Sequence, residues 1–242
     1  MVSKSQIKLV RQLRQKKHRD QHQLFVAEGL KVIREFIDEN YQLHQLYALE
    51  ERYFPSQYVS LINQTQMKAI SDLKAPSEAL AVFAMPKTQT SSQSDLVLAL
   101  DSIQDPGNFG TIIRICDWFG IQDIICSFDT VDCYNPKVVR STMGSLARVQ
   151  VFYKDLESWL MEVNDFQIVA TSMKGQSIYK HSFDTPTVLL IGNEGRGLSK
   201  QLAELSNKTL SIPRFGGAES LNAAMATGII LAEARRHTSI EK

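Results

Sequence analysis

The residues that could do chemistry gather in three glycine-containing segments, each directly after an apolar stretch of the sequence. The first segment is Asp105-Pro-Gly-Asn-Phe-Gly-Thr-Ile-Ile-Arg114. Turn chemistry accounts for its proline, its glycines and Asn108, which can cap the helix that we expect to follow. It does not account for Arg114, because a charged residue inside an apolar run usually needs a partner.

The second segment, Ile191-Gly-Asn-Glu-Gly-Arg-Gly197, carries three glycines around Glu194. The glycines expose backbone amides and permit close contact with a ligand. The segment does not open the first strand-helix-strand unit and has no acidic partner about 20 residues on, as a dinucleotide-binding fingerprint requires. Because Glu194 would also repel a pyrophosphate, a neutral or cationic ligand is favoured over a nicotinamide dinucleotide.

The third segment runs from Ile212 to Gly228 and leads into a helix rich in alanine and glycine. A helix that packs closely against another backbone, with Ser220 as its N-cap, explains the small residues. It leaves the Gly216-Gly217 pair and the carboxamide of Asn222 without a role.

An alternation of apolar strands and helices should position these segments. After Asp95 we expect strands at 96–100, 121–126, 149–152, 167–171, 187–191 and 209–212, and helices at 108–119, 137–146, 156–163, 198–205 and 220–236. Strands separated by helices predict a largely parallel sheet covered on both faces. Such sheets bind ligands at the carboxyl ends of their strands, where all three segments begin.

A polar stretch, Pro86 to Ser94, divides the chain. We predict a small α/β domain over residues 1–88, a linker over 89–94 and a second domain over 95–242. In the first domain we expect helices at 5–14, from 30 onward and at 64–71, and strands at 24–27, 43–49 and 79–85.

Composition limits the function classes. The chain has 242 residues, 43% of them apolar and 22% charged, as expected of a soluble globular protein. Its net charge is +1, so any nucleic-acid binding must rest on local basic patches. The most basic stretch contains Lys4, Lys8, Arg11, Arg14, Lys16, Lys17 and Arg19. Such a run is usually a solvated helix face.

Other features are interpreted as structural. Cys116, Cys126 and Cys133 are expected to be buried, reduced thiols, and neither they nor the five histidines show metal-ligand spacing. The aromatic pairs Tyr53-Phe54 and Trp118-Phe119 are expected in the core. We find no signal peptide and no membrane-spanning run, and expect a cytoplasmic protein.

In order and position, the three segments resemble the signature motifs of the SpoU branch of the SPOUT (knotted) methyltransferases. The resembling stretches are 100–114, 190–198 and 212–229, within a match over about 95–237. Residues 135–144 also resemble a family segment next to the active site. The N-terminal part, with Phe25-Val-Ala-Glu-Gly29, resembles less specifically the small substrate-binding domain of rRNA-directed members. Where the family usually has Val and Ser, this chain has Ala223 and Ala224, so we expect weaker polar contact there.

The resemblance implies a C-terminal trefoil-knotted α/β domain with a parallel sheet, a small N-terminal α/β substrate-binding domain, and a homodimer with sites at its interface. It implies transfer of a methyl group from S-adenosylmethionine to a ribose 2′-hydroxyl of RNA. The implied catalytic residues are Asn108, Arg114, Glu194, Ser220 and Asn222. The implied cofactor-binding residues are Thr171, Ile191, Gly192, Ile212 and Leu221. With this activity, RNA phosphate contact becomes the favoured role of Lys4, Lys8, Arg11, Arg14, Lys16 and Lys17, and Arg140 joins them.

The family pattern assigns Arg114 to activation of the ribose hydroxyl. A guanidinium stays protonated in proteins, so we prefer a hypothesis in which Arg114 clamps a phosphate whose oxygen accepts the proton. A non-catalytic RNA-binding protein on the same scaffold is the alternative, and the intact candidate residues argue against it. The N-terminal domain favours rRNA over tRNA by analogy only.

Overall fold

The computed structural model describes residues 2–86 and 94–236, which form two compact units. One unit combines Met1–Thr90 with Asp132–Ala147, and the other combines Ser91–Val131 with Arg148–Lys242. Residues 89–93 of the predicted linker and 237–242 of the predicted second domain lie outside the described residues. The domain bounds stay a prediction. The structure adds that residues 132–147 pack with the N-terminal unit.

The N-terminal unit contains a four-stranded sheet in the order β1-β4-β2-β3. Its strands are β1 (Leu24–Glu28), β2 (Leu43–Ala48), β3 (Val59–Leu61) and β4 (Ala79–Ala84). Its helices are α1 (Lys4–Gln12), α2 (Lys16–His22), α3 (Leu30–Asp38) and α4 (Gln64–Ile70), with α6 (Pro136–Ser141) from the later segment. The expected strands and helices are confirmed. We did not predict α2, whose residues are almost all polar, or β3, which is too short to show a pattern.

Arg19 corrects our interpretation of the basic run. Its side chain is only 2% exposed and forms an ion pair with Asp132 of the later segment. Its guanidinium also donates to the backbone oxygens of Leu13 and Arg14, both at 2.8 Å. The segment is held further by the ring of Tyr134, centred 4.7 Å from that of Phe25. Arg19 is therefore a structural residue and not part of a solvated helix face.

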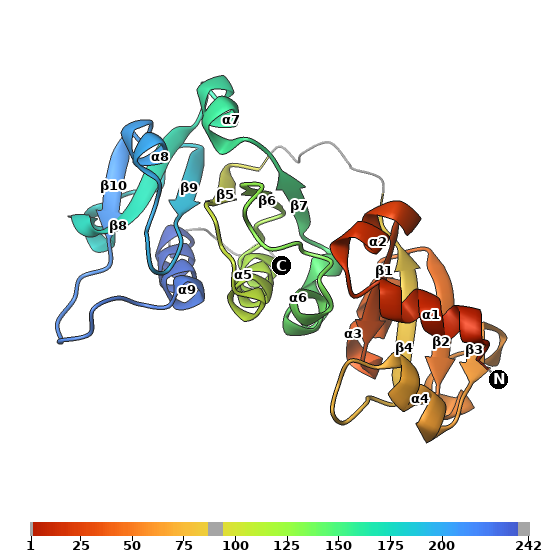
Figure 1. The fold of residues 1–242 in the computed structure, drawn as a ribbon. Helices are drawn as coiled ribbons and strands as arrows, with labels where there is room; N and C mark the ends of the chain where they lie inside the picture. The colour runs from red at the N-terminus through yellow and green to blue at the C-terminus, as the bar shows by residue number, and fades with distance from the viewer. Residues whose placement is uncertain (1, 87–93, 237–242) are drawn as a thin grey trace. The chain divides into compact units, whose positions relative to one another are not determined.

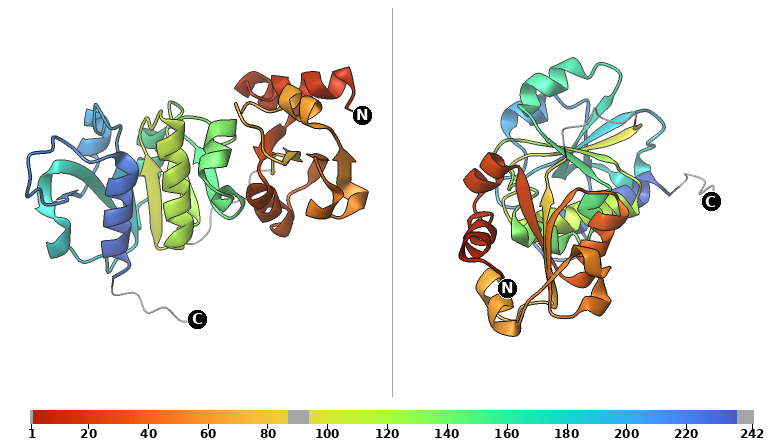
Figure 2. Two further views of the ribbon diagram at one scale, coloured as in Figure 1. Left: turned by 90° about the horizontal axis from the view of Figure 1, so that it is seen from below. Right: turned by 90° about the vertical axis from the view of Figure 1, so that its right-hand side faces the viewer.

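The second unit contains a six-stranded sheet in the order β10-β8-β9-β5-β6-β7, and all neighbouring strands are parallel (Figure 1). The strands are β5 (Leu96–Leu100), β6 (Asp123–Cys126), β7 (Gln150–Tyr153), β8 (Gln167–Ser177), β9 (Thr187–Ile191) and β10 (Lys208–Ser211). Helices α7 (Leu156–Glu162) and α8 (Lys200–Glu204) cover one face, and α5 (Pro106–Trp118) and α9 (Ala223–Ala234) cover the other (Figure 2). The predicted parallel sheet with helices on both faces is confirmed; the knot stays a prediction.

Strand β8 is longer than the predicted 167–171, because its pairing with β10 stops after Ala170 and resumes at Gln176. Its pairing with β9 ends at Ala170, opposite Leu190. Its pairing with β10 shifts register between Thr209 and Leu210, which lie opposite Ala170 and Gln176. The chain from Thr171 therefore leaves the sheet at the carboxyl edge of β9 before it pairs again.

All three cysteines are buried thiols outside any disulfide, as expected. Burial raises the pKa of the Cys116 thiol, and the neighbouring Asp117 raises it further, which keeps this thiol protonated.

The expectation that Trp118 lies in the core is wrong, because its side chain is 85% exposed. It lies four residues after exposed Arg114, so both project from the outer side of α5. None of the described helices has the length and apolar character to cross a membrane.

Candidate active site

The start of α5 is organised by Asp105 and not by Asn108. Asp105 is the N-cap, and its carboxylate accepts a hydrogen bond of 2.8 Å from the backbone N–H of Asn108. Pro106 follows at the first helical position, where its missing N–H costs nothing. An acidic cap followed by proline is a recognisable helix start, so the sequence did contain this signal. The cap leaves the side chain of Asn108 free for longer-range contacts.

One chain of hydrogen bonds joins all three segments. The Nδ2 of Asn222 donates to the Oδ1 of Asn108 at 2.8 Å, and the Nδ2 of Asn108 donates to the Oε1 of Glu194 at 2.6 Å. Asn108 lies 86 residues before Glu194 and 114 residues before Asn222 in the sequence, yet the three side chains lie together at the carboxyl edge of the sheet. The carboxylate of Glu194 accepts, whereas the side-chain amides of Asn108 and Asn222 each donate and accept. These hydrogen bonds set the orientation of each side chain.

Asn222, not Ser220, caps the last helix. Its Oδ1 accepts from the backbone N–H groups of Ala224 and Met225, at 3.0 and 3.3 Å. The same side chain therefore begins α9 and connects it to Asn108. At the other end of the helix pair, the Nε of Arg235 donates to the backbone oxygen of Phe119 at 3.2 Å. Helices α5 and α9 are thus joined at both ends.

The second segment folds into a closed loop. Gly192 is required, because a Cβ there would collide with the backbone of Gly197 and Leu198. Asn193 and Gly197 exchange two backbone hydrogen bonds of 3.1 and 2.8 Å. The Nδ2 of Asn193 donates to the backbone oxygen of Ser102 at 2.8 Å and so ties the second segment to the chain between β5 and the first segment.

Asn193 and Asp101 were not among our candidates. Asp101 is buried after β5, and its carboxylate accepts from the hydroxyl of Ser102 and from the backbone N–H of Ser199. An asparagine beside glycines is a turn signal that could have been noticed. The partner of Asp101 lies 98 residues away, and nothing local in the sequence indicates it.

Arg114 contradicts the expectation of a partner. It is exposed on α5 and makes no hydrogen bond or ion pair with another described residue, whereas Ile112, Ile113 and Cys116 are buried. The helical turn explains this, because a residue of an apolar run still faces outward when its neighbours face inward. Arg114 lies six residues after Asn108, about 9 Å along the helix axis. Neither Arg114 nor exposed Ser220 belongs to the Asn222–Asn108–Glu194 chain.

The candidate cofactor residues lie at the ends of neighbouring strands. Ile191 ends β9 and is buried, and Gly192 follows it. Thr171 lies where β8 leaves the sheet, and its hydroxyl donates to the backbone oxygen of Leu190 at 2.8 Å. Ile212 follows β10 directly, and Leu221 is exposed beside Asn222. Strands β8, β9 and β10 are adjacent, so four of these residues share one edge of the sheet.

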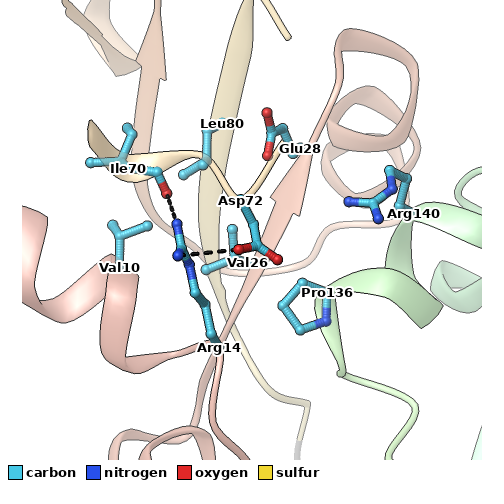
Figure 3. A pocket seen from close by; sticks show the side chains of 9 residues that line it. All are labelled: Val10, Arg14, Val26, Glu28, Ile70, Asp72, Leu80, Pro136 and Arg140. Carbon is cyan, nitrogen blue, oxygen red and sulfur yellow. Dashed lines mark hydrogen bonds and ion pairs between the residues drawn. The ribbon is translucent and has the colours of Figure 1, made fainter. Parts of the chain in front are cut away.

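The candidate RNA contacts lie in the N-terminal unit and differ in how free they are. Lys4, Lys8 and Arg11 line one shallow surface of α1, although the Nε of Arg11 donates to the backbone oxygen of Ala69 at 2.7 Å. Arg14 forms an ion pair with Asp72 at 3.1 Å in the pocket of Figure 3. Arg140, on α6, lines the same pocket, and its side chain makes no hydrogen bond or ion pair with another described residue. The side chains of Lys4, Lys8 and Arg140 are therefore freer than those of Arg11 and Arg14.

Comparison with known proteins identifies the family. Residues 95–232 match the SpoU rRNA methylase family, and residues 4–81 match the MRM3-like substrate binding domain. The chain belongs to the SpoU rRNA methylase family. The matched range contains all ten candidate catalytic and cofactor-binding residues of this SpoU member.

Individual SpoU relatives match over both units. The chain is 28% identical over 229 residues to a 23S rRNA (guanosine(2553)-2′-O)-methyltransferase, RlmP, of Bacillus subtilis, covering 91% of this chain and 92% of that protein. The fold is similar to that of an AdoMet-bound rRNA methyltransferase from Sinorhizobium meliloti, with TM-score 0.88, 32% identity and coverage of 99% and 98%. It is also similar to AviRb from Streptomyces viridochromogenes in complex with AdoMet, with TM-score 0.86, 26% identity and coverage of 99% and 100%.

The Asn222–Asn108–Glu194 hydrogen bonds predict which Asn108 variants lose more methyl-transfer activity than others. Asn108→Ala removes both bonds and should lower kcat/KM for methyl transfer by about 10²-fold through misplacement of the site. Asn108→Asp should be worse, because it sets a second carboxylate against Glu194. Glu194→Gln keeps an acceptor for Asn108 and separates the effect of charge from that of orientation. Steady-state kinetics measure these effects, with exposed Asn164→Ala as the control; an Asn108→Asp variant of wild-type activity would contradict the assignment.

Proposed function

We propose that this chain transfers a methyl group from S-adenosylmethionine to a ribose 2′-hydroxyl of ribosomal RNA. The relatives that match both of its units support this, since RlmP is a 23S rRNA 2′-O-methyltransferase. The tRNA (guanosine(18)-2′-O)-methyltransferase of Aquifex aeolicus instead matches only 60% of the chain. The N-terminal match to a substrate binding domain adds support for an rRNA substrate.

The observation that carries the proposal is the Asn222–Asn108–Glu194 chain. It places one oriented amide or carboxylate from each of three separate segments at a single edge of the sheet. A packed scaffold that only bound RNA would not require these two hydrogen bonds. Their orientation is the preorganisation that group transfer requires.

The residues present fit S-adenosylmethionine. The sheet edge offers backbone groups at Ile191 and Gly192, apolar side chains at Ile212 and Leu221, and the half-buried carboxylate of Glu194. This set suits a cationic ligand that also carries an aromatic base. When bound, S-adenosylmethionine supplies an electrophilic methyl group on its sulfonium. The loop around Gly192 is closed by its own backbone hydrogen bonds and close backbone packing.

Arg114 acts, in this proposal, as a phosphate clamp. Its exposed guanidinium has no described partner to release, and its two parallel N–H groups match a phosphate. The clamp orients the ribose hydroxyl, and a phosphate oxygen accepts the proton. Asn108, Glu194 and Asn222 hold the edge of the site against which the ribose lies, and Ser220 adds a hydroxyl nearby.

We extend the proposal to a cytoplasmic homodimer with the site at its interface. The layer formed by α5 and α9 leaves Trp118 and Met225 exposed, by 85% and 60%. These apolar side chains lie on the same helix pair as Arg114, as expected of a face that a second copy covers. The trefoil knot belongs to the same proposal.

The test is transfer of labelled methyl groups from S-adenosylmethionine to total RNA from cells that lack this gene. We expect label on ribose 2′-oxygens of an rRNA, and none on RNA from cells that contain the gene, because those sites are already methylated. Fractionation of the labelled RNA identifies the substrate. Label only in tRNA would overturn the rRNA assignment, and cofactor binding without transfer to any RNA or ribosomal particle would overturn the activity.

A further inference from the structure

The loop between β10 and α9 leaves one aromatic ring almost entirely in solvent. Phe215 is 96% exposed, whereas Phe25, Phe36, Phe83 and Phe109 are fully buried. A fully exposed phenylalanine gives up the free energy that burial of its ring would gain. The catalytic chain, as assigned above, does not use it.

The loop that carries Phe215 is tied to the candidate active site. It begins after Ser211 at the end of β10 and ends at Asn222, which donates to Asn108. Within it, the guanidinium of Arg214 donates to the backbone oxygen of Ala218 at 3.3 Å. The ring is therefore presented on a braced loop next to the proposed site of methyl transfer.

The two glycines after the ring are not needed by the described fold. A Cβ added to Gly216 or Gly217 would meet no atom within 4 Å, and neither residue has a positive φ. This contrasts with Gly192, which its own loop requires. Glycines without an internal role leave the backbone beside the ring uncovered, so that a flat ligand can approach it.

The charges around the ring favour a nucleic acid. Arg214 is exposed directly before Phe215. Glu219 is the exposed acid of the same loop. An aromatic side chain with adjacent arginine matches single-stranded RNA, whose bases stack on aromatic rings while phosphates bind guanidinium groups.

We propose that Phe215 is a stacking platform for a base of the RNA segment that enters the active site, and that Arg214 contacts the phosphate beside that base. The inference rests on the proposed function and adds a residue that positions the RNA. Stacking tolerates any base, so the platform supplies affinity and orientation more than sequence preference.

The test compares Phe215→Ala and Phe215→Leu with Phe215→Tyr and Phe215→Trp. An unmodified 23S rRNA transcript serves for methyl transfer, and a fluorescein-labelled fragment of it for binding. We expect alanine and leucine to weaken RNA binding and kcat/KM by about 5- to 150-fold, and tyrosine and tryptophan to retain both. Met161→Ala, an exposed apolar residue on α7, is the matched control and should change neither.

Each other result has a defined meaning. If leucine binds RNA as well as tyrosine does, the role is not stacking and the proposal is overturned. Loss of S-adenosylmethionine affinity in the alanine variant would make Phe215 a cofactor contact, and a changed oligomeric state in light scattering would make it a subunit contact; either overturns the platform. RNA binding that depends on the aromatic ring, without methyl transfer by the wild-type protein, would overturn the proposed function and keep the platform.

Discussion

Replacing Arg114 with alanine is expected to lower the rate of methyl transfer by about 10²- to 10³-fold, the effect of removing one oriented donor from a site of charge stabilisation. Stability should be unchanged, because Arg114 is exposed and has no hydrogen bond or ion pair with another described residue. Cofactor affinity should also be unchanged, since Arg114 acts on the RNA in this proposal. Single-turnover kinetics with saturating S-adenosylmethionine measure the effect.

Arg114→Lys separates a clamp from a simple charge. Lysine keeps the positive charge but lacks the planar pair of N–H groups that binds a phosphate through two bonds. We therefore expect Arg114→Lys to resemble Arg114→Ala. Near-normal turnover of the lysine variant would contradict the clamp. Lys200→Ala is the control, because Lys200 is exposed on α8 and pairs only with Glu204 among the described residues.

Replacing Arg19 with alanine is expected to lower the free energy of unfolding of the N-terminal unit by about 3 kcal/mol, because it leaves the Asp132 carboxylate without its buried cation. The change also removes two hydrogen bonds to the backbone oxygens of Leu13 and Arg14. Urea unfolding followed by circular dichroism measures the loss. Arg52→Ala, which breaks an exposed pair with Glu50, should leave the free energy of unfolding nearly unchanged.

The same variant tests the correction made to the basic run. If Arg19 contacted RNA phosphate, its loss would reduce the slope of RNA affinity against salt concentration by about one. A structural Arg19 leaves that slope unchanged in conditions where the variant is folded. An Arg19→Ala protein of wild-type stability with a reduced slope would contradict the structural assignment.

The local pattern of apolar and polar residues predicted most of the helices and strands. The apolar runs at 96–100 and 187–191 were predicted as parallel strands and are β5 and β9. The pattern failed where the signal was weak or depended on distant partners. Helix α2 is polar and is held through its buried Arg19, which pairs with Asp132, and Trp118 faces outward although Phe119 next to it is apolar. Neither outcome follows from periodicity alone, because burial depends on what packs against each face.

The sequence by itself determined the family, the parallel sheet and the three segments that hold the candidate site, because strand and turn preferences are local and the motif residues keep their order along the chain. Only the tertiary structure decided which of these residues meet. Asn222, Asn108 and Glu194 form one chain, while Arg114 and Ser220 remain apart from it. Hydrogen bonds between residues 86 to 114 positions apart depend on the order of strands in the sheet and on helix start points, and neither is encoded in a local pattern.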